Sequence, residues 1–311
     1  MQLNLRQIVF RVSSVICTLC IVSSLSFFSY GKQTNDGKTG SHTTRVPGTM
    51  PPAARAVVEE AMGVVCMQSK LDPRGSQAID DMQGRPSLPV NTPDARAGAA
   101  RAQRLLPLAK DLVTNALRQL IAEYKVPMGP RFNARLQQGL ARVSNVKTVR
   151  PDMESRDNAS VFLSRPHTIT FGTIFLAGLR SDEGMISVLA HELMHIADGD
   201  SDSLRILMTA VGAKAMNLTG LDIRGQRSEE LTCDLIGAMA VREFVASTPG
   251  YESITRRLSR SVEHNCVQID EGDEDHLSPR NTIRALLALH PVLVRELIFD
   301  REERSVPRPK Q

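Results

Sequence analysis

Two histidines and a glutamate with metal-site spacing stand in the segment His191-Glu192-Leu193-Met194-His195. On an α-helix, residues four apart lie on one face, one turn above each other, so both imidazoles can reach a single metal ion. Glu192 projects beside that face, where a carboxylate suits a base acting on metal-bound water. Apolar neighbours from residue 184 to 196 favour a buried helix, in which polar side chains need partners. The alternative is a solvated helix face carrying these residues by coincidence.

A catalytic zinc site usually takes three protein ligands, which leaves its fourth position to water. Glu230 follows His195 by 35 residues and shares a helix face with Asp234, four residues on. Glu230 is therefore the candidate third ligand, and Asp234 the candidate acceptor for the distal N–H of a ligand histidine. Glu229 competes with Glu230 but points about 100° away on the helix. The alternative is an exposed acidic face.

Other residues of metal-binding type receive no such role. Cys233 lies on a different face of its helix from Glu230 and is interpreted as a packed thiol. Four further histidines lack ligand-like spacing: His42, His167, His264 and His276. Three cysteines lie outside the first 31 residues: Cys66, Cys233 and Cys266. One hypothesis is a disulfide between Cys66 and Cys266, and the other is that all three are buried free cysteines.

Composition excludes some function classes. Apolar residues make up 41% of the 311 residues, enough to bury a core. Aromatic residues make up 4%, there is no Trp, and the net charge of +4 forms no basic stripe. We therefore expect no nucleic-acid partner.

The first 31 residues are typical of an export signal. Arg6 and Arg11 precede an uncharged run at residues 12–28. Residues 1–31 are predicted to be a signal peptide cleaved near Gly31, or an uncleaved signal-anchor held in the membrane by residues 12–28. The protein is therefore expected to be exported, either periplasmic or secreted, with membrane contact only through this segment if it is retained.

Apolar periodicity predicts an α+β fold for the rest of the chain. Residues 32–56 form a flexible linker, and 57–130 an N-terminal helical segment of unknown role, with helices at 57–69 and 100–125. Short strands are predicted at 146–149, 160–163 and 168–176. Helices follow at about 183–198, 203–217, 227–246, 252–265 and 280–303, the last interrupted near Pro291. The domain is assigned to residues 131–305, with a small sheet next to the helix of His191 and His195.

The motif pair resembles the gluzincin zinc metallopeptidases of the HtpX/BepA and CAAX-prenyl-endopeptidase type, peptidase family M forty-eight. That family combines H-E-x-x-H with E-x-x-A-D, and here the second element is Glu230-Leu-Thr-Cys233-Asp234, with Cys in place of Ala. Upstream, Asn158-Ala159, residues 168–175 and Gly178-Leu179 match the order of the family's Asn-Ala pair, β segment and Gly-Leu. In relatives this stretch forms the edge strand that receives an extended peptide.

A His-Pro motif near the C-terminus is a weaker point of similarity. His290-Pro291 with Arg295 resembles the family's His-Pro followed by Arg, although the Arg falls one residue early and Leu289 replaces Ser or Thr. His290 is thus a candidate for the outer shell of the site. The alternative is an ordinary His-Pro at a helix start.

The resemblance covers about residues 130–300 and implies a mostly helical zincin-like domain. It implies one Zn²⁺ per chain, held by His191, His195 and Glu230, and a zinc-bound water activated by Glu192. The chain is similar to the exported, soluble kind of relative, so the expected reaction is hydrolysis of peptide bonds in exported or envelope proteins. The expected substrates are unfolded or misfolded envelope polypeptides. The alternative is a non-catalytic or chaperone-like envelope quality-control factor that keeps the fold.

Overall fold

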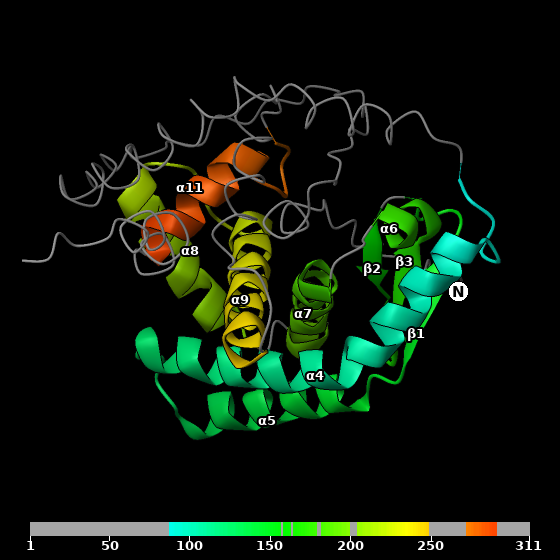
Figure 1. The fold of residues 1–311 in the computed structure, drawn as a ribbon. Helices are drawn as coiled ribbons and strands as arrows, with labels where there is room; N and C mark the ends of the chain where they lie inside the picture. Colours follow the sequence, from blue (N-terminus) through cyan, green and yellow to red (C-terminus); the bar gives the residue numbers. More distant parts are fainter. Residues whose placement is uncertain are drawn as a thin grey trace, which may run out of the picture.

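The computed structural model describes residues 87–156, 158–162, 164–178, 182–199, 204–248 and 272–290 (Figure 1). The predicted leader, linker, helices at 57–69 and 252–265, and the Cys66–Cys266 disulfide lie outside these residues. The domain boundaries stay predictions.

Two helices form the base on which the site is built, α4 (Pro93–Glu123) and α5 (Pro130–Asn145), side by side at the bottom of Figure 1. The helix predicted at 100–125 is confirmed and begins earlier, with Pro107 on its exposed side. Helix α5 was not predicted, although its buried residues repeat at helical spacing: Phe132, Leu136, Gly139 and Val143.

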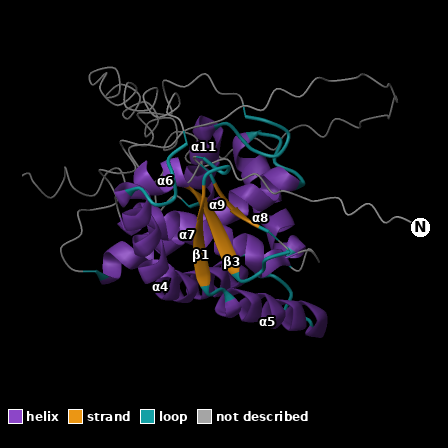
Figure 2. Cartoon of the chain, turned by 90° about the vertical axis from the view of Figure 1, so that its right-hand side faces the viewer, coloured by secondary structure: helices purple, strands orange, loops and turns teal. Residues whose placement is uncertain are grey.

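A three-stranded mixed sheet lies beside these helices (Figure 2). It consists of β1 (Thr148–Asp152), β2 (Ala159–Val161) and β3 (Thr168–Gly172), in the order β1-β3-β2. β3 pairs parallel with β1 and antiparallel with β2. The resemblance implies that residues 158–179 supply an edge strand. Of the two strands in this stretch, β3 is central in the sheet and only β2 lies at an edge.

The strand predicted at 168–176 is wrong beyond Gly172, because residues Thr173–Gly178 form helix α6. The Arg156 carbonyl accepts hydrogen bonds from the N–H groups of Ile174 (2.9 Å) and Phe175 (3.2 Å). A Cβ at position 172 would lie 2.0 Å from that same oxygen, so only glycine fits there. This long-range contact turns the chain, and local β-propensity does not reveal it.

Four further helices complete the described part: α7 (Asp182–Asp198), α8 (Arg205–Thr219), α9 (Gln226–Ser247) and α11 (Pro279–Leu289). In Figure 1, α7 and α9 stand side by side above α4. The described residues thus contain seven helices and one small sheet, which confirms the α+β, mostly helical fold. None of the described helices has the length and apolarity needed to cross a membrane.

An arginine of α5 caps the C-terminus of α7. Arg142 donates from Nε to the Ile196 carbonyl (2.9 Å), and from Nη2 to those of Ala197 (2.6 Å) and Asp198 (2.9 Å). These carbonyls have no partner within the helix, and a cation is favourable at this end of the dipole. The last turn of α7, which carries His195, is therefore fixed to α5.

Candidate metal centre

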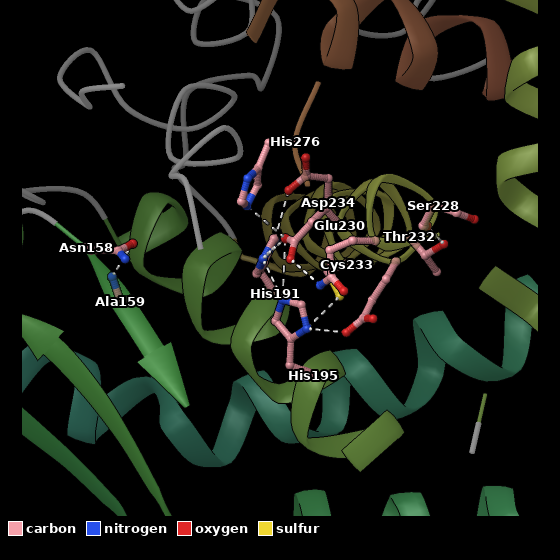
Figure 3. Close-up of polar contacts among 12 residues, drawn as sticks. Asn158, Ala159, His191, His195, Ser228, Glu230, Thr232, Cys233, Asp234 and His276 are labelled. Atoms are coloured by element: carbon pink, nitrogen blue, oxygen red, sulfur yellow. Dashed lines mark hydrogen bonds and ion pairs between the residues drawn. The ribbon is translucent and has the colours of Figure 1, made fainter. Parts of the chain in front are cut away.

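Helices α7 and α9 bring two imidazoles and a carboxylate together in the core (Figure 3). His191, His195 and Glu230 are 3%, 6% and 6% exposed. Their Nε2, Nε2 and Oε2 atoms form a triangle: His191 to His195 is 3.1 Å, His191 to Glu230 is 3.3 Å, and His195 to Glu230 is 3.5 Å.

This triangle matches the ligand spacing of a tetrahedral metal ion. Two donors that each lie about 2.0–2.1 Å from a tetrahedral zinc are about 3.3–3.4 Å apart, within the range of the observed edges. The Glu230 Oε2 atom is buried and makes no hydrogen bond to any residue that the structure describes. A cation would satisfy it, since buried polar atoms rarely lack partners. The residues present therefore fit a divalent metal.

The charge state of Glu230 agrees with this arrangement. Burial alone would raise the pKa of its carboxyl group. The neighbouring imidazoles of His195 and His191 outweigh burial and hold this pKa well below its usual range. Glu230 is therefore an anion, as a metal ligand must be.

The thiol of Cys233 lies next to the same pair of histidines. Its Sγ is 3.6 Å from Nδ1 of His195, and the residue is fully buried and free of any disulfide. His191, His195 and Cys233 thus form a buried group that could hold a metal ion. Cys233 meets His195 on the Nδ1 side, whereas Glu230 and His191 meet it at Nε2. The structure consequently offers two donor sets that share both histidines.

Each histidine has a carboxylate on its Nδ1. Asp234 Oδ1 is 2.9 Å from Nδ1 of His191, in the position the sequence analysis predicts, and Glu229 Oε1 is 3.0 Å from Nδ1 of His195. Burial lowers the pKa of His191, but its contacts with Asp234 and Glu230 prevail and raise it to about 9. Both carboxylates face Nδ1, so Nε2 is the nitrogen that each ring directs at the triangle.

Glu192 is a buried carboxyl group with an exposed fraction of 0%. Within the described part of the chain, neither of its oxygens has a hydrogen-bond partner. Burial raises its pKa to about 7, against the opposing effect of His191 and His195. A buried carboxyl group that titrates near neutrality beside two histidines has the chemistry of a proton carrier.

A third histidine, which the sequence analysis left without a role, also reaches the cluster. His276 precedes α11, and its Nε2 lies 3.8 Å from Oε2 of Glu230 (Figure 3). Its Nδ1 contacts Oδ1 of Asp273 at 2.9 Å, and Arg227 of α9 donates from Nε to the Asp273 carbonyl at 3.0 Å. No spacing in the sequence indicates this approach, because it depends on how the loop before α11 folds onto α9.

Two other predicted elements lie elsewhere. Nε2 of His290 is 3.3 Å from Oε2 of Glu123 at the end of α4, so the structure brings this residue to α4 rather than to the triangle. Asn158 accepts a hydrogen bond from the Ala159 N–H at 3.0 Å, at the start of β2 and to the side of the cluster in Figure 3. The roles expected for both stay predictions.

Comparison with family models, curated proteins and solved structures finds no match to this chain. The family resemblance therefore rests on the motif residues.

Proposed function

We propose that the protein is a zinc-dependent endopeptidase. The observation that carries the proposal is the convergence of Nε2 of His191, Nε2 of His195 and Oε2 of Glu230, with the unpartnered carboxyl group of Glu192 next in the chain. Two imidazoles and one carboxylate are a donor set found in catalytic zinc sites of metalloproteases. In this proposal these three residues hold one Zn²⁺ per chain.

When bound, zinc supplies Lewis-acid chemistry, which lowers the pKa of water and polarises a carbonyl group. Glu192 accepts a proton from the attacking water on a carboxylate oxygen and passes it to the leaving amine. Its raised pKa of about 7 suits both transfers near neutral pH. Asp273 contacts Nδ1 of His276 and orients its ring, so Nε2 of His276 faces the cluster, where it can contact an anionic oxygen of the substrate.

The substrates in this proposal are unfolded or misfolded exported polypeptides. The export signal expected at residues 1–31 supports that location, and β2 lies at an edge of the sheet, where an extended peptide could pair.

The experiment compares the purified full chain with its Glu192→Gln variant. We expect about one zinc per chain in both by elemental analysis. Casein cleavage should fall by about 10²–10⁴-fold in the variant, because a general base contributes on that order. The control is Glu243→Gln, an exposed position of α9, which should cleave at the wild-type rate.

Three results separate the alternatives. A wild-type chain without stoichiometric zinc contradicts the proposal. A zinc-loaded wild type that cleaves neither casein nor unfolded envelope proteins favours the non-catalytic quality-control factor. Equal cleavage by wild type and Glu192→Gln assigns the activity to another group.

A further inference from the structure

The imidazole of His195 lies between two carboxylates from adjacent residues of α9. Glu230 faces its Nε2 at 3.5 Å, and Glu229 faces its Nδ1 at 3.0 Å. Consecutive helical residues point about 100° apart, so they reach one ring only because it lies edge-on between them. One turn of α9 therefore supplies both the candidate ligand and a group behind the ring.

We propose that Glu229 is a positioning residue, which fixes the ring orientation of His195 so that Nε2 faces the metal. This inference rests on the proposed function, since it assigns Glu229 a task only at the metal site. It departs from the sequence interpretation, in which Glu229 points away from the site.

The ring of His195 has two orientations that place its nitrogens differently. A half-turn about the Cβ–Cγ bond exchanges Nδ1 with Cδ2 and Nε2 with Cε1. In the turned ring, neither Glu229 nor Glu230 faces a nitrogen, and His191 loses its 3.1 Å neighbour. The contact at 3.0 Å to Glu229 therefore favours the one orientation in which Nε2 completes the triangle.

Cys233 competes with Glu229 for Nδ1 of His195. Cys233 also approaches Nδ1, at 3.6 Å, but a thiol is a weak acceptor and a carboxylate a strong one. Glu229 is thus the stronger partner for an N–H on Nδ1, and Cys233 is a packing neighbour of the ring.

The other histidine of the triangle has a carboxylate in the same position. His191 has Asp234 on its Nδ1 at 2.9 Å, fully inside the core, whereas the Glu229 side chain is 18% exposed. Glu229 and Asp234 lie on either side of Glu230 in α9 and serve one histidine each. Such outer carboxylates typically change metal affinity by 10–100-fold.

The experiment uses the full chain and three variants: Glu229→Ala, Glu229→Gln and the control Glu243→Ala. Glu243 is a surface carboxylate of the same helix that contacts Asn115, far along α9 from the cluster. Zinc dissociation constants come from competition with a chelator. Ring orientation comes from the ¹H–¹⁵N imidazole spectrum, in which a proton on Nδ1 bonded to a carboxylate resonates far downfield.

Glu229→Ala should weaken zinc binding 10–100-fold and remove the downfield Nδ1 signal of His195. Glu229→Gln keeps an acceptor oxygen, so it should weaken binding less than tenfold and retain the signal near its position. Glu243→Ala should change neither. A merely structural role for Glu229 would lower stability without changing the imidazole signal.

A folded Glu229→Ala variant with the wild-type zinc affinity and the wild-type His195 signal would overturn the inference. If Glu229→Ala does not fold, the spectra of the wild type and of Glu229→Gln provide the test. A wild-type spectrum in which His195 carries no proton on Nδ1 would also overturn the inference. The spectrum can be recorded without metal, so failure of the wild type to bind zinc would reject the proposed function and leave this test intact.

Discussion

Replacement of Arg142 by alanine should destabilise the fold through the C-terminus of α7. The side chain makes three hydrogen bonds, to the carbonyls of Ile196, Ala197 and Asp198. In the variant, water can reach part of this half-buried end, so each bond is worth about 1 kcal/mol, and the lost charge at the helix dipole adds about 0.3–1 kcal/mol. We expect a loss of about 3–4 kcal/mol in the free energy of unfolding.

The assay is urea unfolding of the full chain, with Arg142→Lys and Arg135→Ala as companions. Lysine keeps the charge without the fork of donors, so it should restore only part of the loss. Arg135 is an exposed residue of the same helix, and its removal should change stability by less than about 0.5 kcal/mol. Because His195 lies in the last turn of α7, zinc affinity should also fall in Arg142→Ala. A change below about 1 kcal/mol, or one equal to that of Arg135→Ala, would refute the role of the cap.

Three further predictions concern the site. Glu192→Gln should make the metal-free chain more stable than wild type at higher pH. The Glu192 carboxyl group has a pKa of about 7 in the folded chain and an ordinary value of 4.5, so wild type loses on the order of 3 kcal/mol of stability between about pH 4.5 and 7, and the variant does not. Thermal-unfolding curves of the two proteins that run parallel across that window would contradict this. Asp234→Asn should weaken zinc binding about 10–100-fold in chelator competition, because it removes the anion on Nδ1 of His191, and an unchanged affinity would reject that role. His276→Ala should keep zinc but lower kcat for casein about 10–100-fold; loss of zinc instead would make His276 a ligand.

Local periodicity was sufficient for the parts of the site that one helix determines. His191 with His195, and Glu230 with Asp234, are pairs four residues apart, and each pair lies on one helix face in the structure. What the sequence analysis missed depends on packing between distant elements. His276 reaches Glu230 through a folded loop, and Glu229 reaches His195 because the ring lies between the side chains of two adjacent residues of α9.

In the fold, too, the features that depend on packing between distant segments were not predicted from the sequence. Helices α7, α8 and α9 were predicted close to their observed bounds, α4 begins seven residues before its predicted start, and α5 was not predicted. The end of β3 was not predicted either, because the close approach of Gly172 to the Arg156 carbonyl is a contact between segments. His290 Nε2 lies 3.3 Å from Oε2 of Glu123, and the outer-shell role that the His-Pro motif suggests for this residue stays a prediction.

The central claim is that two imidazoles and the carboxylate of Glu230 hold the metal, with Cys233 outside the ligand set. Zinc-edge X-ray absorption of the zinc-loaded full chain measures this directly. The account predicts only nitrogen and oxygen neighbours, at about 2.0–2.2 Å. A sulfur neighbour at about 2.3 Å would place Cys233 on the metal and contradict it.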